Sequence, residues 1–159
     1  MICYSSSALD NAISKSCLKG RPFGGVAIFI RSSIATNCGL LIAAPRYIIL
    51  LCGDTLFINV HLPCKSTLHR EEEHTDCLVS VMHDVCDSDI HYSNIVFGGD
   101  MNVDITETGV ICNILMNFLE GMGLNLLMTR SRLMNVIPSE LILLVPPRPS
   151  IILLSLARQ

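Results

Sequence analysis

"RYIILLCGDTLFINVHL", residues 46–62, is the stretch that decides the fold. Two runs rich in Ile, Leu, Val and Phe flank the short segment "CGDT". A Gly-Asp pair between apolar runs is typical of a two-residue hairpin turn. Pro63 ends the second run, because proline has no N–H group to donate to a neighbouring strand. The stretch therefore predicts two strands joined by a tight turn.

Further strands and two helices are expected on either side of this hairpin. Residues 24–34, "GGVAIFIRSSI", and residues 94–97 are short apolar runs that predict buried strands. In residues 67–87, apolar side chains recur at intervals of three and four, which predicts an amphipathic helix with an acidic outer face. Residues 110–122 have the same period and end near two glycines. Because strands and helices alternate, the predicted fold class is α/β or α+β.

Length and composition indicate one globular domain. The chain has 159 residues, of which 50% are hydrophobic and 16% charged, enough to build a sizeable core. Its net charge of −3 gives no overall basic field of the kind that marks many nucleic-acid-binding proteins. The eight cysteines lie partly in apolar, strand-like runs, so reduced thiols in an intracellular protein of the nucleus or cytoplasm are expected. We expect neither a signal peptide nor a transmembrane segment.

Asp100 and Asn102 are the first candidates for chemistry. They follow the apolar run and two glycines of "IVFGGDMNVDI", residues 95–105. In an extended chain, residues two apart face the same way, so both side chains are expected to project together where glycines let a substrate approach. A carboxylate can deprotonate water or hold a divalent cation, and a carboxamide can donate to a phosphate oxygen. The pair suits phosphodiester hydrolysis, although Gly-Asp-x-Asn is also ordinary turn chemistry.

Three stretches together resemble a known family. They are "GRPFGGVAIF" (20–29), "LFINVHLPC" (56–64) and "IVFGGDMNVDI" (95–105), in this order and with these spacings. Together they resemble the endonuclease/exonuclease/phosphatase superfamily, and most of all the apurinic-type endonuclease domain of non-LTR, LINE-like retrotransposons. The resemblance runs from about residue 4 to residue 127. It implies a fragment of a four-layer α/β sandwich with two packed, mainly antiparallel sheets, and Mg²⁺-dependent nicking of DNA.

The resemblance also implies roles for three residues. Asp100 and Asn102 match the family's Asp-x-Asn, so Asp100 would activate the attacking water and hold Mg²⁺, supported by Asn102. His61 stands where many relatives have a Tyr, and its imidazole can donate a hydrogen bond to phosphate. A half-buried strand residue is the alternative interpretation of His61. The family's upstream metal-binding Glu and its C-terminal Ser-Asp-His motif have no counterpart in this sequence, so we expect a half-present site with weak or no activity.

The expected organisation is a partial endonuclease domain over residues 1–128, followed by a divergent tail over residues 129–159. Four prolines interrupt the apolar pieces of this tail, and no structure is predicted for it. DNA is the expected partner, with Lys19 and Arg21 beside the "GRPFGG" loop as candidate contacts to its backbone, although a surface turn is the favoured interpretation of this loop. Neither a membrane partner nor a small-molecule cofactor is expected.

Two other functions remain open. Three His-x-x-Cys pairs, "HLPC" (61–64), "HTDC" (74–77) and "HDVC" (83–86), have the short spacing of zinc ligands. On a helix, however, residues three apart are simply neighbours. Alternatively, the chain is a non-catalytic remnant that serves as an interaction or scaffold domain. The "REEEH" run (70–74) would then offer an acidic face to a partner, although such runs are usually solvated helix faces.

Overall fold

The structure is a computed structural model that describes residues 1–7, 25–65, 67–106, 108–125, 140–144 and 151–155. Its elements in these ranges are β1 (Ile2–Ser6), β2 (Val26–Ile30), the 3-10 helix η1 (Ala35–Asn37), β3 (Cys38–Ala43), β4 (Tyr47–Cys52), β5 (Thr55–His61), α2 (Arg70–Cys86), β6 (Asn94–Asp100), α3 (Val110–Gly121), β7 (Glu140–Leu144) and β8 (Ile151–Ser155). The "GRPFGG" loop with Lys19 and Arg21 lies largely outside the described residues, as does the predicted boundary between residues 128 and 129.

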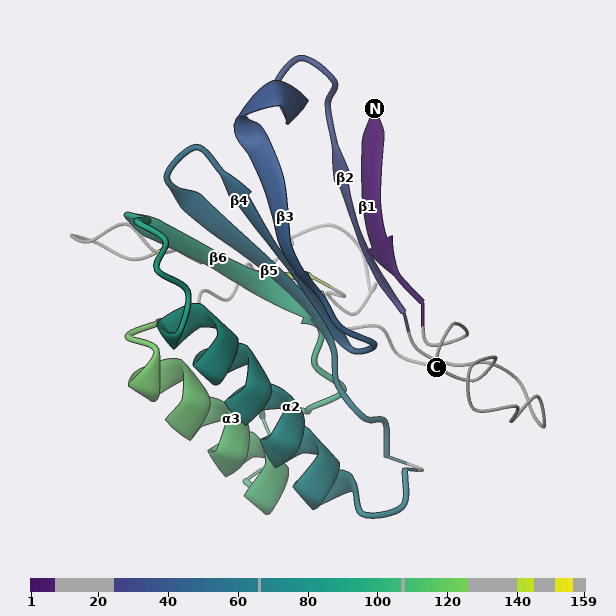
Figure 1. Ribbon diagram of the computed structural model, residues 1–159. Helices are drawn as coiled ribbons and strands as arrows, with labels where there is room; N and C mark the ends of the chain where they lie inside the picture. The colour runs from purple at the N-terminus through teal and green to yellow at the C-terminus, as the bar shows by residue number, and fades with distance from the viewer. Residues whose placement is uncertain (8–24, 66, 107, 126–139, 145–150, 156–159) are drawn as a thin grey trace, which may run out of the picture.

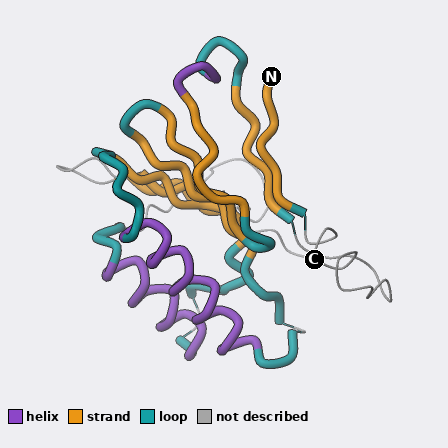
Figure 2. Tube along the Cα trace, in the orientation of Figure 1, coloured by secondary structure: helices purple, strands orange, loops and turns teal. Residues whose placement is uncertain are grey.

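A six-stranded sheet with the order β3-β4-β5-β6-β8-β7 is the middle layer of the fold. Strands β3, β4 and β5 run antiparallel, β5, β6 and β8 run parallel, and β7 is antiparallel to β8. Helices α2 and α3 lie side by side on one face (Figures 1 and 2). The antiparallel pair β1–β2 packs on the other face. This confirms the α/β class with two mainly antiparallel sheets, and the described residues supply three of the four expected layers.

The predicted hairpin over residues 46–62 is confirmed as β4 and β5. Cys52 pairs with Thr55, so that Gly53 and Asp54 alone make the turn. Gly53 has a φ of 62°, which is a left-handed conformation that glycine adopts without a steric penalty. The two-residue turn at Gly53 and Asp54 therefore sets the register of the two central strands.

The alternation of side chains buries this hairpin on both faces. Ile49 pairs with Ile58, and both belong to the core cluster that includes residues of α2 and α3. Leu50 pairs with Phe57 on the opposite face, where Leu50 forms a second cluster with Ile30 of β2. Each fully buried Ile or Leu contributes about 2 kcal/mol of hydrophobic stabilisation. Both outer layers are thus anchored to the same two strands.

Both predicted helices are confirmed. The buried positions of α2 recur every three or four residues, and those of α3 do the same: His74, Cys77, Leu78, Val81 and Val85 on α2, and Leu115, Phe118 and Leu119 on α3. The Phe118 ring of α3 lies 5.1 Å from the ring of Phe97 on β6, which ties the helix to the sheet. In the described ranges, neither helix combines the length and apolar character that crossing a membrane requires.

Four strands were not predicted from the sequence. β1 and β3 are short and partly exposed, so neither shows a clear alternation of apolar and polar residues. β7 and β8 fall in the predicted divergent tail, yet β8 joins the large sheet beside β6 with Val96 opposite Ile151. A strand paired inside a sheet reads as a continuous apolar run, and such a run has no periodicity to detect.

Gly99 allows β5 and β6 to approach closely. Its φ is 126°, and a Cβ atom built there would lie 1.9 Å from the carbonyl oxygen of Val60 and 2.6 Å from Asn59 Oδ1. The sequence suggested that the glycines before Asp100 let a substrate approach. The structure corrects this for Gly99, because the backbone of the neighbouring strand already fills that space.

We expect Gly99→Ala to lower the free energy of unfolding by at least about 3 kcal/mol, because the new methyl group meets backbone and the φ is strained. Urea denaturation measures this change. Gly39→Ala is the matched control, since a Cβ there meets nothing within 4 Å and its backbone is ordinary. Equal midpoints for the two variants would contradict the close strand approach.

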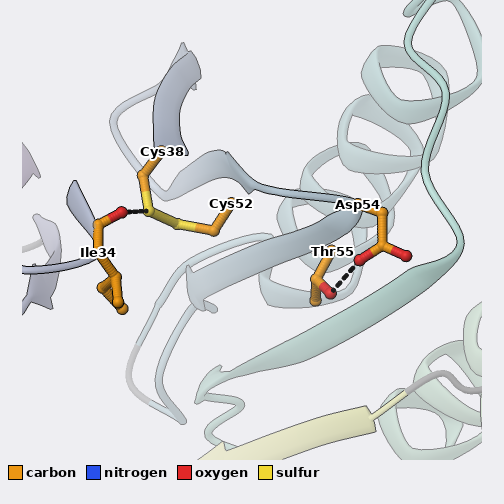
Figure 3. Close-up of a disulfide and its surroundings, with 5 residues drawn as sticks. All are labelled: Ile34, Cys38, Cys52, Asp54 and Thr55. Carbon is orange, nitrogen blue, oxygen red and sulfur yellow. Dashed lines mark hydrogen bonds between the residues drawn. A yellow bond between two sulfur atoms is a disulfide. The ribbon is translucent and has the colours of Figure 1, made fainter. Parts of the chain in front are cut away.

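A disulfide joins Cys38 of β3 to Cys52 of β4, which are opposite each other in the sheet (Figure 3). The Cys38 sulfur also lies 3.3 Å from the carbonyl oxygen of Ile34. In a disulfide that sulfur has no hydrogen to donate, so this is a packing contact. The prediction of reduced thiols is therefore wrong for this pair, because strand pairing places two half-buried cysteines side by side. Cys3, Cys77, Cys86 and Cys112 take part in no disulfide.

Alkylation of the unfolded, unreduced chain followed by peptide mapping should recover residues 38 and 52 as one linked peptide. Replacing both Cys38 and Cys52 with Ser should lower the free energy of unfolding by about 2–3 kcal/mol, as expected for a short closed loop. Cys86→Ser, at an exposed thiol of α2, is the control and should leave stability unchanged. Recovery of both cysteines as alkylated thiols would exclude the disulfide.

Candidate functional site

The parallel pairing of β5 with β6 brings two predicted site residues together. His61, the last residue of β5, is opposite Asp100, the last residue of β6. His61 Nε2 lies 3.9 Å from Asp100 Oδ2, and the two side chains are 29% and 22% exposed. This distance is too long for a hydrogen bond. An imidazole and a carboxylate thus face each other at a half-buried strand end.

Asn102 reaches the same place through a turn. The Asp100 Oδ1 atom accepts a hydrogen bond of 3.1 Å from the Asn102 backbone N–H, and Asn102 has a left-handed φ of 49°. The expectation that an extended chain makes both side chains face the same way is wrong, because the strand ends at Asp100. The interpretation of Gly-Asp-x-Asn as turn chemistry is confirmed, since the aspartate caps its own backbone two residues on.

Hydrogen bonds from this turn join the ends of β5 and β6. Asn102 Nδ2 donates to the carbonyl of Leu62 at 2.8 Å, and the Leu62 N–H donates to the carbonyl of Asp100 at 2.8 Å. The guanidinium of Arg70, at the start of α2, donates to the carbonyl of Asn102. The Asn102 residue is therefore held through its backbone N–H, its carbonyl and its side-chain nitrogen.

His74, one helical turn after Arg70, is hydrogen-bonded to the loop that follows β5. It is fully buried, and its Nε2 lies 2.9 Å from the carbonyl of Pro63. Because a carbonyl can only accept, Nε2 carries the hydrogen, and Nδ1 is an acceptor with no partner among the described residues. Burial lowers the pKa of His74 to about 4; the hydrogen bond to Pro63 opposes this shift, and the nearby Arg70 and Arg46 add to it. His74 is neutral at pH 7 and has a structural role.

The three His-x-x-Cys pairs do not form a zinc site in the described part of the chain, where no three His, Cys, Asp or Glu side chains come together. His74 bonds to backbone, and Cys77 is a core residue whose pKa burial raises to about 11, so its thiol stays protonated. His83 is exposed and lies 3.1 Å from Asp87. Helical spacing accounts for the pairs at 74–77 and 83–86, which lie on α2.

Only some of the side chains in the acidic run over residues 70–74 are exposed to solvent. Glu73 forms an ion pair of 2.7 Å with Arg46 of the sheet layer, and His74 is buried. Glu72 is exposed, and its Oε2 lies 3.5 Å from Nδ1 of His69, which is also exposed. The side chains that point inward fix α2 to the sheet, so the remaining charge is a small solvated patch.

No family model matches the sequence, and no curated protein or solved structure matches the chain. The functional assignment therefore depends on the arrangement of Asp100, Asn102 and His61. Sequence reasoning missed Arg70, which touches the turn after β6 from a helix far away in the sequence. No local pattern could have revealed this contact, because it depends on how α2 packs against the sheet.

The buried His74 predicts a dependence of stability on pH. Its pKa falls from 6.5 in the unfolded chain to about 4 in the folded one, so the unfolded state binds the extra proton between these values. The free energy of unfolding should therefore rise with pH from 4 to 6.5, by about 3 kcal/mol from this group. Urea denaturation at several pH values measures the slope.

His74→Gln should remove this part of the slope while keeping a side-chain N–H for the Pro63 carbonyl. His83→Gln is the matched control on the same helix, because His83 is 69% exposed. A His74→Gln variant with the wild-type slope would show that this histidine does not titrate on unfolding.

Proposed function

We propose that this chain is a remnant of a Mg²⁺-dependent DNA endonuclease of the retrotransposon type, with weak phosphodiester hydrolysis of its own. The observation that carries the proposal is the pairing of His61 with Asp100 at the ends of two parallel strands. Asn102 completes the group from the turn that follows. These are the three residues to which the family resemblance assigned roles.

In the proposed reaction, Asp100 acts as the general base. Its Oδ1 is engaged by the Asn102 N–H, which leaves Oδ2, on the side of His61, to accept a proton from water. The oxygen of that water attacks the phosphorus, and the bond from phosphorus to the leaving sugar oxygen breaks; that oxygen keeps the electron pair and takes a proton from solvent water. His61 donates from Nε2 to a non-bridging phosphate oxygen, and the second side-chain N–H of Asn102 does the same.

The donor set around Asp100 fits Mg²⁺ in part. A carboxylate oxygen of Asp100 and the Oδ1 of Asn102 are hard oxygen ligands, which Mg²⁺ prefers, and the ion commonly keeps several waters and shares the substrate's phosphate. Bound there, it would neutralise charge on the scissile phosphate. Within the described ranges, no cluster of three acidic, His or Cys side chains is present to hold it more firmly. Weak metal binding is the reason we propose weak turnover.

Nicking of supercoiled plasmid tests this proposal. We expect slow relaxation that needs Mg²⁺ and an excess of protein over plasmid. Asp100→Ala should lower the rate on the order of 100-fold or more, because it removes the general base. Asp104→Ala is the matched control: Asp104 also caps a backbone N–H two residues on, that of Thr106 at 3.0 Å, but has no role in the proposed reaction.

Two results would contradict the proposed activity. Wild-type protein that nicks no faster than Asp100→Ala would favour a non-catalytic interaction or scaffold domain. Equal losses in Asp100→Ala and Asp104→Ala would show that the turn, and not the carboxylate of Asp100, is what matters. Circular dichroism of both variants establishes that the fold is retained before rates are compared.

A further inference from the structure

Arg70 touches both loops that bound the candidate site. Its guanidinium donates through Nη2 to the carbonyl of Asn102 and through Nε to the carbonyl of Pro63, the latter at 3.3 Å. One loop follows β6 and the other follows β5, so a single planar group joins them. From this geometry we propose that Arg70 is a positioning residue that sets the direction of the Asn102 side chain. The function of Asn102 itself rests on the proposed endonuclease activity.

Asn102 needs an external support because its backbone is unusual. With a φ of 49° it is one of two described non-glycine residues in the left-handed region. This conformation costs a non-glycine residue roughly 1 kcal/mol, although Asn tolerates it better than most. The carbonyl of Asn102 points to α2 and is met there by Arg70. Removing that donor releases the carbonyl and with it the constraint on the turn.

The direction of the carboxamide follows from this backbone. Asn102 Nδ2 donates to the carbonyl of Leu62 at 2.8 Å, which uses one of its two hydrogens. The second N–H and the Oδ1 atom are the groups that can meet a phosphate or a metal ion. If the turn rotates, the hydrogen bond to Leu62 breaks, and the second N–H and the Oδ1 of Asn102 no longer point to the site. Arg70 therefore acts on the site through Asn102 and makes no contact with the reacting atoms itself.

Arg70 is held rigidly enough for this role. It is the first residue of α2, and His74 in the next turn bonds to the same carbonyl of Pro63. Glu73 beside it is fixed by its 2.7 Å ion pair with Arg46. A lysine at position 70 would keep the charge but lose the planar fork that reaches two carbonyls at once. The guanidinium shape, and not the charge alone, is what the geometry requires.

Arg70→Gln and Arg70→Lys in the full chain test the proposal by nuclear magnetic resonance. Hydrogen exchange of the Asn102 side-chain amide should become at least roughly tenfold faster in both variants, as expected on losing a hydrogen bond to a charged group. Backbone amides of β5 and β6 should keep their protection, which shows that the fold is intact. Arg46→Lys is the matched control, because Arg46 also holds the first turn of α2 but through Glu73.

Nicking assays on the same variants give the second readout. If the wild type cleaves, Arg70→Lys should lower kcat and leave KM for DNA unchanged, whereas Arg46→Lys should change neither. If the wild type does not cleave, the proposed activity fails, and exchange at Asn102 still decides the role of Arg70. Unchanged Asn102 exchange in folded Arg70→Gln would overturn positioning by Arg70. So would global unfolding of both Arg70 variants, because that would make Arg70 a residue of the fold as a whole.

Discussion

The parallel pairing of β5 with β6 is the constraint on which the rest of the structure depends. Gly99 permits it, because a side chain there would collide with the backbone of Val60. The resulting register places His61 opposite Asp100 and lets the turn at Asn102 bond back to the end of β5. A slip of one residue would send the His61 side chain to the opposite face of the sheet. The fold and the candidate site therefore share one determinant.

Helix α2 links the core to this strand end. Its apolar side chains cover one face of the sheet, and the same packing carries Arg70 and His74 to the carbonyls of the two loops. A buried carbonyl without a donor is costly, so these polar contacts stabilise the fold as well as the site. Substitutions in the first turn of α2 act on stability and on site geometry together, which is why matched control variants are needed to separate the two effects.

The polar residues of this chain divide according to what they contact. His74 and Cys77 are buried in the core and neutral, and His74 is bonded through Nε2 to the carbonyl of Pro63. His61 and Asp100 are half-buried at a strand end, and the Nδ1 atom of His61 is buried without a partner in the described part of the chain. The Nδ1 atom of the core residue His74 is in the same state, so it is the half-buried position at the strand end beside Asp100 that distinguishes His61. Asp100 is the acidic side chain of this group, and its lone carboxylate is the basis of the weak metal binding and weak turnover that we propose.

Local signals in the sequence determined the central hairpin, both helices, the strand before Asp100 and the Asp-x-Asn motif, because turn chemistry and apolar periodicity depend on near neighbours alone. Tertiary structure decided the contacts between segments that are distant in the sequence, which local signals do not predict. Strand β8 beside β6, the Cys38–Cys52 disulfide and the contact of Arg70 with Asn102 all join segments distant in the sequence. The motif indicated Asp100 and Asn102 as candidate site residues. The directions of their side chains depend on the packing of α2 and on the register of β5 with β6.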